Sequence, residues 1–153
     1  MRALADEIIQ FFISQGFVIV STLDSDGSIH SACKGIVDIN RSGRVHLFDL
    51  YQARTLDNLK RNPRISITAV DEHKFAGYSL KGKAKILAED AISKHLIKAW
   101  EVRITSRLTQ RLLKNIHEEK GHRGHPEALL PDPKYLIAVD VEEIIDLTPH
   151  HLK

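Results

Sequence analysis

FDLYQARTLDNLKRNP, residues 48–63, closes a strand, turns, and opens a short helix. That helix is predicted over 53–61, with Leu56 and Leu59 on its inward face. It ends before Pro63, because the residue that precedes a proline avoids the helical region of backbone conformation. The segment therefore predicts a strand–turn–helix unit near the middle of the chain.

The start of this helix carries Gln52, Ala53, Arg54 and Thr55. The first backbone N–H groups of a helix have no partner within the helix, and the helix dipole places partial positive charge there. An arginine fork and a threonine hydroxyl at the same place add donors that suit a phosphate. The residues alone leave two interpretations open, which are a phosphate site and a helix start whose Arg54 is simply solvated.

Strand patterns lie on both sides of this segment. Strands are predicted over 17–23, 29–39, 44–49, 64–70, 75–87 and 135–147, and further helices over 3–14 and 89–120. The turn sequences DSDG and NRSG join the first three strands into an antiparallel meander. Short antiparallel strands with turns at this spacing predict a small closed barrel.

Two further features of the pattern carry local predictions. Gly77 and Gly82 interrupt the fifth strand, where a glycine is typical of a bulge or of a close approach of two backbones. In the 89–120 helix, apolar residues recur every four positions from Ile92 to Leu112. A strict four-residue step drifts around a helix, so we expect a bend or a break there.

Composition bounds the kind of protein. With 153 residues, the chain suits a single domain over 1–153, with a helical and loop segment at 89–134 before the last strand. A net charge of +2 is too small to indicate a nucleic-acid partner by itself, and none is predicted; no apolar run approaches the length of a membrane span. Cys33 is the one cysteine, which predicts a reducing cytoplasm and a buried, inert thiol.

The order of these motifs resembles a known family. A strand–DSDG–strand unit, the 48–63 segment, RISITAV and GYSLKGKAKI together are similar to the pyridoxamine 5′-phosphate oxidase-like FMN-binding split barrels. The resemblance covers residues 8–88, and 135–147 matches the family's closing strand. It implies a mainly β fold with flanking helices, built as a six-stranded antiparallel split β-barrel that is Greek-key-like. It also implies a homodimer with FMN in a crevice between subunits.

The resemblance implies a cofactor site position by position. Arg54 matches a phosphate-binding arginine. The next family position is often lysine, but here it is Thr55, which donates a hydroxyl and brings no charge. Lys34, on the second strand, is the candidate for the compensating cation. Phe48 and Asp49 match positions that line the flavin, and we expect Asp49 to face the polar edge of the ring or a backbone amide.

The remaining cofactor positions are Gln52 and Ala53 at the helix start, and Gly77 and Tyr78 on the fifth strand. The last two are expected to approach the flavin from the partner subunit. FMN offers a dianionic phosphate, a flexible ribityl chain and a flat ring. These groups need cationic and amide donors at one end and an apolar slot at the other, which the helix start and the strands before it provide.

Two other groups of residues have open interpretations. Arg103, Arg107, Arg111 and Lys114 share one basic face of the long helix. This face is either solvated or an anion site for nucleic acid or for a phosphorylated substrate, which Arg103 and Arg107 would contact. The histidines at 122, 125, 150 and 151 could bind a metal or haem, but no carboxylate or cysteine stands at a recognisable ligand spacing. We therefore predict no metal site.

Three functional hypotheses follow. The first is an FMN-dependent oxidoreductase acting on an unknown small molecule, in which the flavin carries the electrons and the protein positions the reactants. The second is a non-catalytic flavin or haem binder that serves as a sensor, store or electron carrier. The third is a binding module with a basic helix that has lost its cofactor, which Thr55 and Asp49 favour. No side chain is assigned as a catalytic acid or base.

Overall fold

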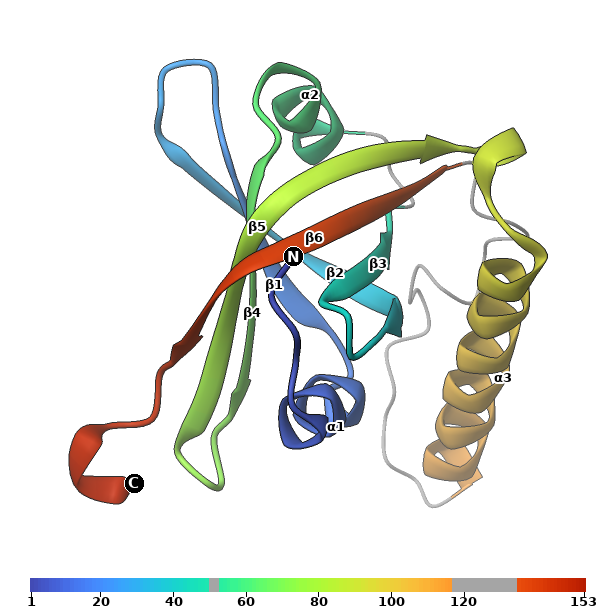
Figure 1. Ribbon diagram of the computed structural model, residues 1–153. Coiled ribbons are helices and arrows are strands. Elements are labelled where there is room, and N and C mark those ends of the chain that lie inside the picture. Colours follow the sequence, from blue (N-terminus) through green and yellow to red (C-terminus); the bar gives the residue numbers. More distant parts are fainter. Residues whose placement is uncertain (50–52, 117–134) are drawn as a thin grey trace.

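A computed structural model describes residues 1–49, 53–116 and 135–153. Within these residues, six antiparallel strands form a closed barrel in the order β1-β2-β3-β6-β5-β4 (Figure 1). The strands are β1 Val18–Leu23, β2 Ile29–Ile39, β3 Arg44–Phe48, β4 Arg64–Asp71, β5 Ala76–Ala88 and β6 Tyr135–Asp146. The helices are α1 Asp6–Ser14, α2 Arg54–Arg61 and α3 Lys94–Ile116, with 3₁₀ turns η1 Glu89–Ala91 and η3 His150–Leu152. The predicted mainly β fold, with a six-stranded antiparallel split barrel and flanking helices, is confirmed.

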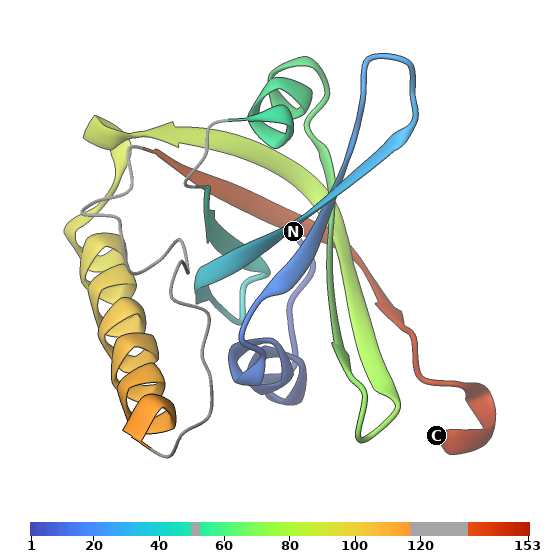
Figure 2. The same cartoon turned by 180° about the vertical axis from the view of Figure 1, so that it is seen from behind.

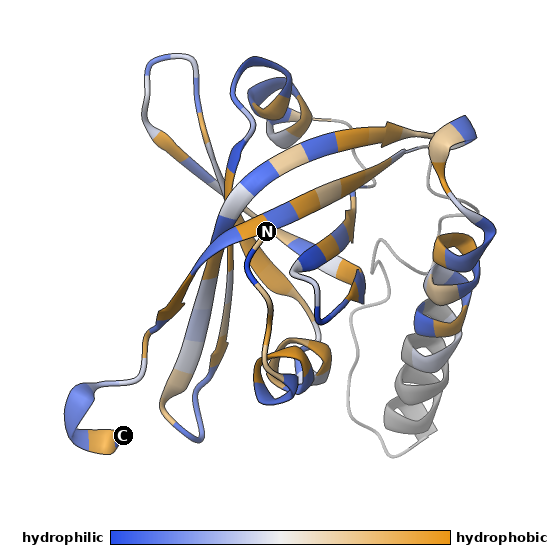
Figure 3. Ribbon diagram, viewed as in Figure 1, coloured by the Kyte–Doolittle hydropathy of each residue, from blue (hydrophilic) through white to orange (hydrophobic). Residues whose placement is uncertain are grey.

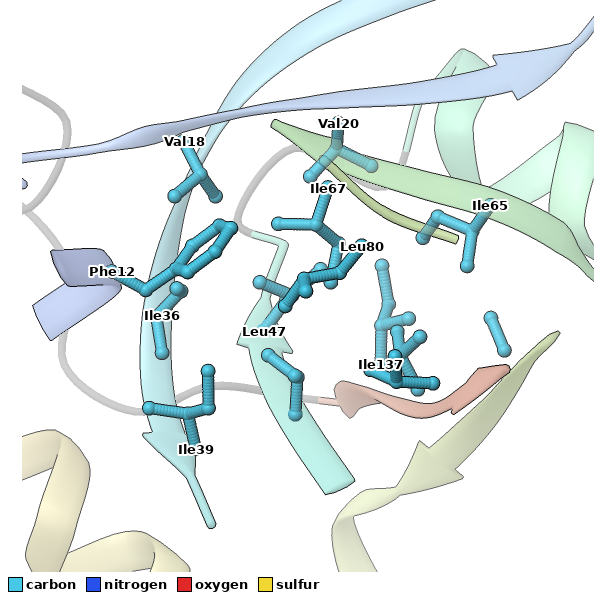
Figure 4. Close-up of a cluster of buried hydrophobic side chains, with 14 of the residues drawn as sticks. Phe12, Val18, Val20, Ile36, Ile39, Leu47, Ile65, Ile67, Leu80 and Ile137 are labelled. Carbon is cyan, nitrogen blue, oxygen red and sulfur yellow. The ribbon is translucent and has the colours of Figure 1, made fainter. Parts of the chain in front are cut away.

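The barrel interior is filled by every second residue of its strands. Figure 4 shows the aliphatic side chains of the barrel wall converging, with Phe12 of α1 reaching in between Val18 and Ile36. Phe12 is fully buried at one end, and Leu56 and Leu59 of α2 are buried at the other. Burying one such side chain contributes roughly 1.5–3 kcal/mol, so the two helices are held as plugs at the barrel ends.

α3 packs on the outside of the barrel, apart from the two helices that close its ends (Figures 1 and 2). Its Leu96 and Trp100 form a second apolar cluster with Val37, Phe48 and Leu136. The rings of Phe48 and Trp100 meet edge to face, with centroids 6.5 Å apart. This cluster fixes where α3 lies over the outer face of β2, β3 and β6.

Each strand begins and ends within one residue of its predicted bounds. The long helix begins later than predicted, after the η1 turn at 89–91. It then runs from Lys94 to Ile116 as one continuous helix, so the break expected within its apolar stripe is wrong for the described residues. Residues 117–120 of the predicted helix lie outside the described residues. At Gly82 the register between β5 and β6 shifts, and a Cβ there would collide with the Asp140 carbonyl. The predicted bulge and close approach at Gly82 are confirmed.

The prediction for Cys33 is wrong, because its thiol is exposed. Cys33 lies opposite Ile19 on the outer face of the barrel, while Lys34 lies opposite the buried Val18. Adjacent residues of a strand point to opposite faces. Lys34 therefore takes the inner side, and the cysteine is left outside.

Hydrophobic and hydrophilic residues alternate along β5, as expected for a strand with one face on a core (Figure 3). In the part of the chain that the structure describes, no helix combines the length and the apolar character needed to cross a membrane.

Candidate functional site

Asn58 ties α2 to the strand pair beside it. It is 1% exposed, and its Nδ2 donates to Thr22 Oγ1 at 3.0 Å and to Asp24 Oδ1 at 2.9 Å. Its Oδ1 accepts a hydrogen bond from Arg61 Nη2 at 2.6 Å. Both N–H groups and the carbonyl of the amide are thus used. This fixes α2 against the end of β1 and the turn that follows.

Sequence reasoning missed Asn58, although a signal was present. Leu56 and Leu59 define the inward stripe of α2, and Asn58 is a polar residue placed between them on the same buried side. A buried amide is costly unless it is hydrogen-bonded, so a polar residue at such a position indicates a specific partner. The partner comes from a turn 34 residues earlier, which local patterns do not reveal.

Arg54 is the first residue of α2, and its side chain is 65% exposed. Its Nη1 lies 3.8 Å from Asp24 Oδ2. Ala53 occupies the N-cap position and is exposed, and no side chain among the described residues caps this end of the helix. First-turn N–H groups and an exposed guanidinium are donors of the kind that bind an anion. Thr55 is buried against the barrel.

Lys34 and Asp49 form a buried ion pair. Lys34 Nζ lies 2.9 Å from Asp49 Oδ1, with the two side chains 9% and 2% exposed. Lys34 is on the inner face of β2, and Asp49 directly follows β3. The structure thus joins two predicted cofactor residues, but their charges cancel. Asp49 faces an ammonium group through its Oδ1, and its expected approach to a ring edge or a backbone amide stays a prediction.

The other predicted cofactor residues are spread over the barrel. Phe48 points outward beneath α3 and is 3% exposed. Gly77 lies opposite Val70 in the β4–β5 pair. Tyr78 packs edge-on against Phe11 of α1 with ring centroids 5.2 Å apart, at the barrel end away from α2. Within one chain neither of these two β5 residues reaches α2, and their expected approach from a partner subunit stays a prediction. Gln52 lies outside the described residues.

Arg103 of the basic helix face is half-buried, and its Nη2 donates to the Gln15 carbonyl at 3.4 Å. Burial lowers the pKa of its guanidinium below the usual value. The side chain of Arg107 lies outside what the structure describes, as do His122 and His125. The proposed role of Arg103 and Arg107 toward an acidic substrate therefore stays a prediction.

A second polar cluster, which sequence reasoning missed, lies on the outer face of β2, β3 and β6. His46 Nδ1 is 3.5 Å from Asp38 Oδ2, and Arg44 forms an ion pair with Asp140. Burial lowers the pKa of His46, although the nearby Asp38 carboxylate acts in the opposite direction. The signal for this cluster is cross-strand register, which pairs His46 with Asp38 and Arg44 with Asp140.

Comparison with known proteins shows which family this sequence matches. A family model described as pyridoxamine 5′-phosphate oxidase matches residues 4–146. No curated protein sequence matches this chain significantly.

Solved structures share the fold over nearly their whole length. HupZ of Group A Streptococcus superposes with a TM-score of 0.65 at 18% identity, covering 95% of this chain and 94% of that one. A Clostridium acetobutylicum protein, related to general stress protein 26 of B. subtilis and assigned to the pyridoxinephosphate oxidase family, gives 0.57 at 16% identity, covering 98% and 100%. An F420 reductase gives 0.58 at 12% identity, covering 93% and 98%. At identities this low, the superpositions establish a shared fold and nothing more.

Proposed function

This chain belongs to the pyridoxamine 5′-phosphate oxidase family, and we propose that it binds FMN at the α2 end of its barrel and acts as an oxidoreductase on a small molecule. The family commonly binds flavin. The F420 reductase among the structural neighbours supports a flavin or deazaflavin ligand in the same fold.

The observation that carries this proposal is the start of α2. An exposed arginine stands at a helix N-terminus that no described side chain caps, and the buried Asn58 holds that helix in place. A phosphate bound there would accept hydrogen bonds from the Arg54 guanidinium and from first-turn backbone N–H groups. These donors fit the phosphate of FMN, and Thr55 adds no charge to them.

When bound, the flavin supplies the hydride or electron transfer. The residues of this chain hold and orient it. Arg54 binds the phosphate, and Asn58 keeps Arg54 in position by fixing α2 to Thr22. Lys34 and Asp49 contribute polar groups without net charge, because each neutralises the other. In the proposed homodimer, the site is completed by residues Gly77 and Tyr78 of the partner subunit.

A non-catalytic flavin carrier is the second candidate. Two points favour it. The cations Arg54 and Lys34 each have a carboxylate partner, so the site carries little net positive charge. Among the described residues, we identify no side chain beside Arg54 as a catalytic acid or base. Rapid reduction of the bound flavin by NADH or NADPH, followed by reoxidation on adding an acceptor, supports the enzyme. Flavin that is bound but reduced no faster than free FMN supports the carrier.

The experiment that tests FMN binding is a fluorescence titration of the purified protein, together with its absorption spectrum. We expect a flavin spectrum, and Arg54→Ala should weaken FMN binding by about 1.5–3 kcal/mol because a charge-assisted bond to the phosphate is lost. Arg64→Ala is the matched control, since Arg64 is an exposed arginine at the start of β4. An unchanged FMN affinity in Arg54→Ala would remove the phosphate assignment.

A further inference from the structure

The turn between β1 and β2 places carboxylates beside the start of α2. Asp24 Oδ2 lies 3.8 Å from Arg54 Nη1, and Asp24 Oδ1 accepts a hydrogen bond from Asn58 Nδ2 at 2.9 Å. Asp26 is part of the same turn. Hydrogen bonds from Ser28 hold the pKa of Asp26 below its usual value, and the charge of Arg54 adds to that effect. Arg54 therefore stands in a locally acidic setting.

The side chains of Arg54 and Asp24 differ in how firmly each is held in place. The Arg54 side chain is 65% exposed, and a pair this exposed is weak and easily broken. The Asp24 side chain is 22% exposed, and the buried amide of Asn58 anchors it. Arg54 can turn toward a ligand, whereas the Asp24 carboxylate stays where it is.

We infer that Asp24 sets the phosphate selectivity of the proposed flavin site. Its carboxylate competes with the ligand phosphate for the Arg54 guanidinium and repels the dianion. The protein therefore distinguishes FMN from unphosphorylated riboflavin less strongly than Arg54 alone would allow. Lys34 does not restore the missing charge, because Asp49 neutralises it. This inference rests on the proposed function and names Asp24 as a residue that determines specificity at the same site.

The test compares the dissociation constants of FMN and riboflavin for the parent protein and its Asp24→Asn variant. Asparagine keeps an Oδ1 that accepts the hydrogen bond from Asn58, so the change removes charge and preserves the anchor. We expect FMN to bind about three- to tenfold more tightly at low salt, and riboflavin affinity to stay unchanged. Because salt screens exposed charges, the gain should shrink as ionic strength rises to about 1 M.

Glu142→Gln is the matched control. Glu142 Oε1 also lies within 4 Å of a cation, at 3.6 Å from Lys83 Nζ, and the Glu142 side chain is 53% exposed. It belongs to β6 and is not one of the residues proposed to hold the flavin in either subunit. Removing this charge should alter neither dissociation constant, so an FMN gain confined to Asp24→Asn reports a local effect rather than a change of net charge.

The outcomes separate the inference from the proposed function. If Arg54→Ala weakens FMN binding but Asp24→Asn leaves it unchanged, the inference is overturned and the proposed site stands. If Asp24→Asn tightens FMN and riboflavin equally, the inference is also overturned, because the effect is not on the phosphate. If the parent protein binds neither flavin, both fail. Should Asp24→Asn fail to fold in a thermal scan, Asp24→Ser replaces it. The same results are then expected for Asp24→Ser, and the same results would overturn the inference.

Discussion

At the outer face of β3, His46 is 8% exposed and lies beside the Asp38 carboxylate. Arg44 and Asp140 are the other charged groups that act on it. Burial is the largest effect and disfavours the imidazolium, which lowers the pKa of His46 below its unfolded value. The folded protein therefore holds this histidine neutral at a pH where the unfolded chain already binds a proton.

We expect His46 to make the protein less stable in mild acid. Below the unfolded histidine pKa of about 6.5, the unfolded state binds more protons than the folded state, so the free energy of unfolding falls as pH drops. His46→Gln removes the titrating group and should lose less stability than the parent protein between pH 7.5 and 5. Urea unfolding at both pH values measures this difference, and equal losses in the two proteins would contradict it.

At the scale of single elements, α2 is held by one buried amide in addition to its two buried leucines. Asn58→Ala removes three hydrogen bonds and leaves Thr22 Oγ1 and Asp24 Oδ1 without the donor they share. We expect the free energy of unfolding to fall by about 1–3 kcal/mol. FMN binding should also weaken, because Arg54 would no longer be fixed relative to the barrel.

Lys60→Ala is the control for this prediction, because Lys60 is an exposed residue on the same helix. Its effect on stability should stay within about 0.5 kcal/mol. Chemical unfolding and FMN titration of both variants provide the measurements. If Asn58→Ala binds FMN as tightly as the parent protein, the amide has no positioning role.

The elements themselves could be predicted because their signals are local. Alternating strands, the DSDG and NRSG turns and Asn62-Pro63 each act over a few residues, and the observed strand bounds follow them. The packing of one element against another could not be predicted in this way. The burial of Phe48 under α3 and the exposure of Cys33 depend on which face of β2 and β3 turns inward, which only the assembled barrel decides.

At the scale of the whole molecule, the closed barrel separates the predicted site residues. Arg54 lies at the α2 end, while Gly77 and Tyr78 lie toward the α1 end of the same chain. The family resemblance correctly indicated the fold, but the ion pairs of Lys34 with Asp49 and of Arg54 with Asp24 follow from barrel register and turn geometry. Those pairs, rather than the motif, determine the charge that a ligand would meet.

The most direct measurement of the central claim is a crystal structure of this protein grown with excess FMN. We predict two copies of the chain around each flavin, with the phosphate bound by Arg54 and the first turn of α2, and with Tyr78 of the partner subunit beside the ring. A structure in which the α2 terminus binds no phosphate, or in which FMN lies elsewhere on a single chain, would contradict the account.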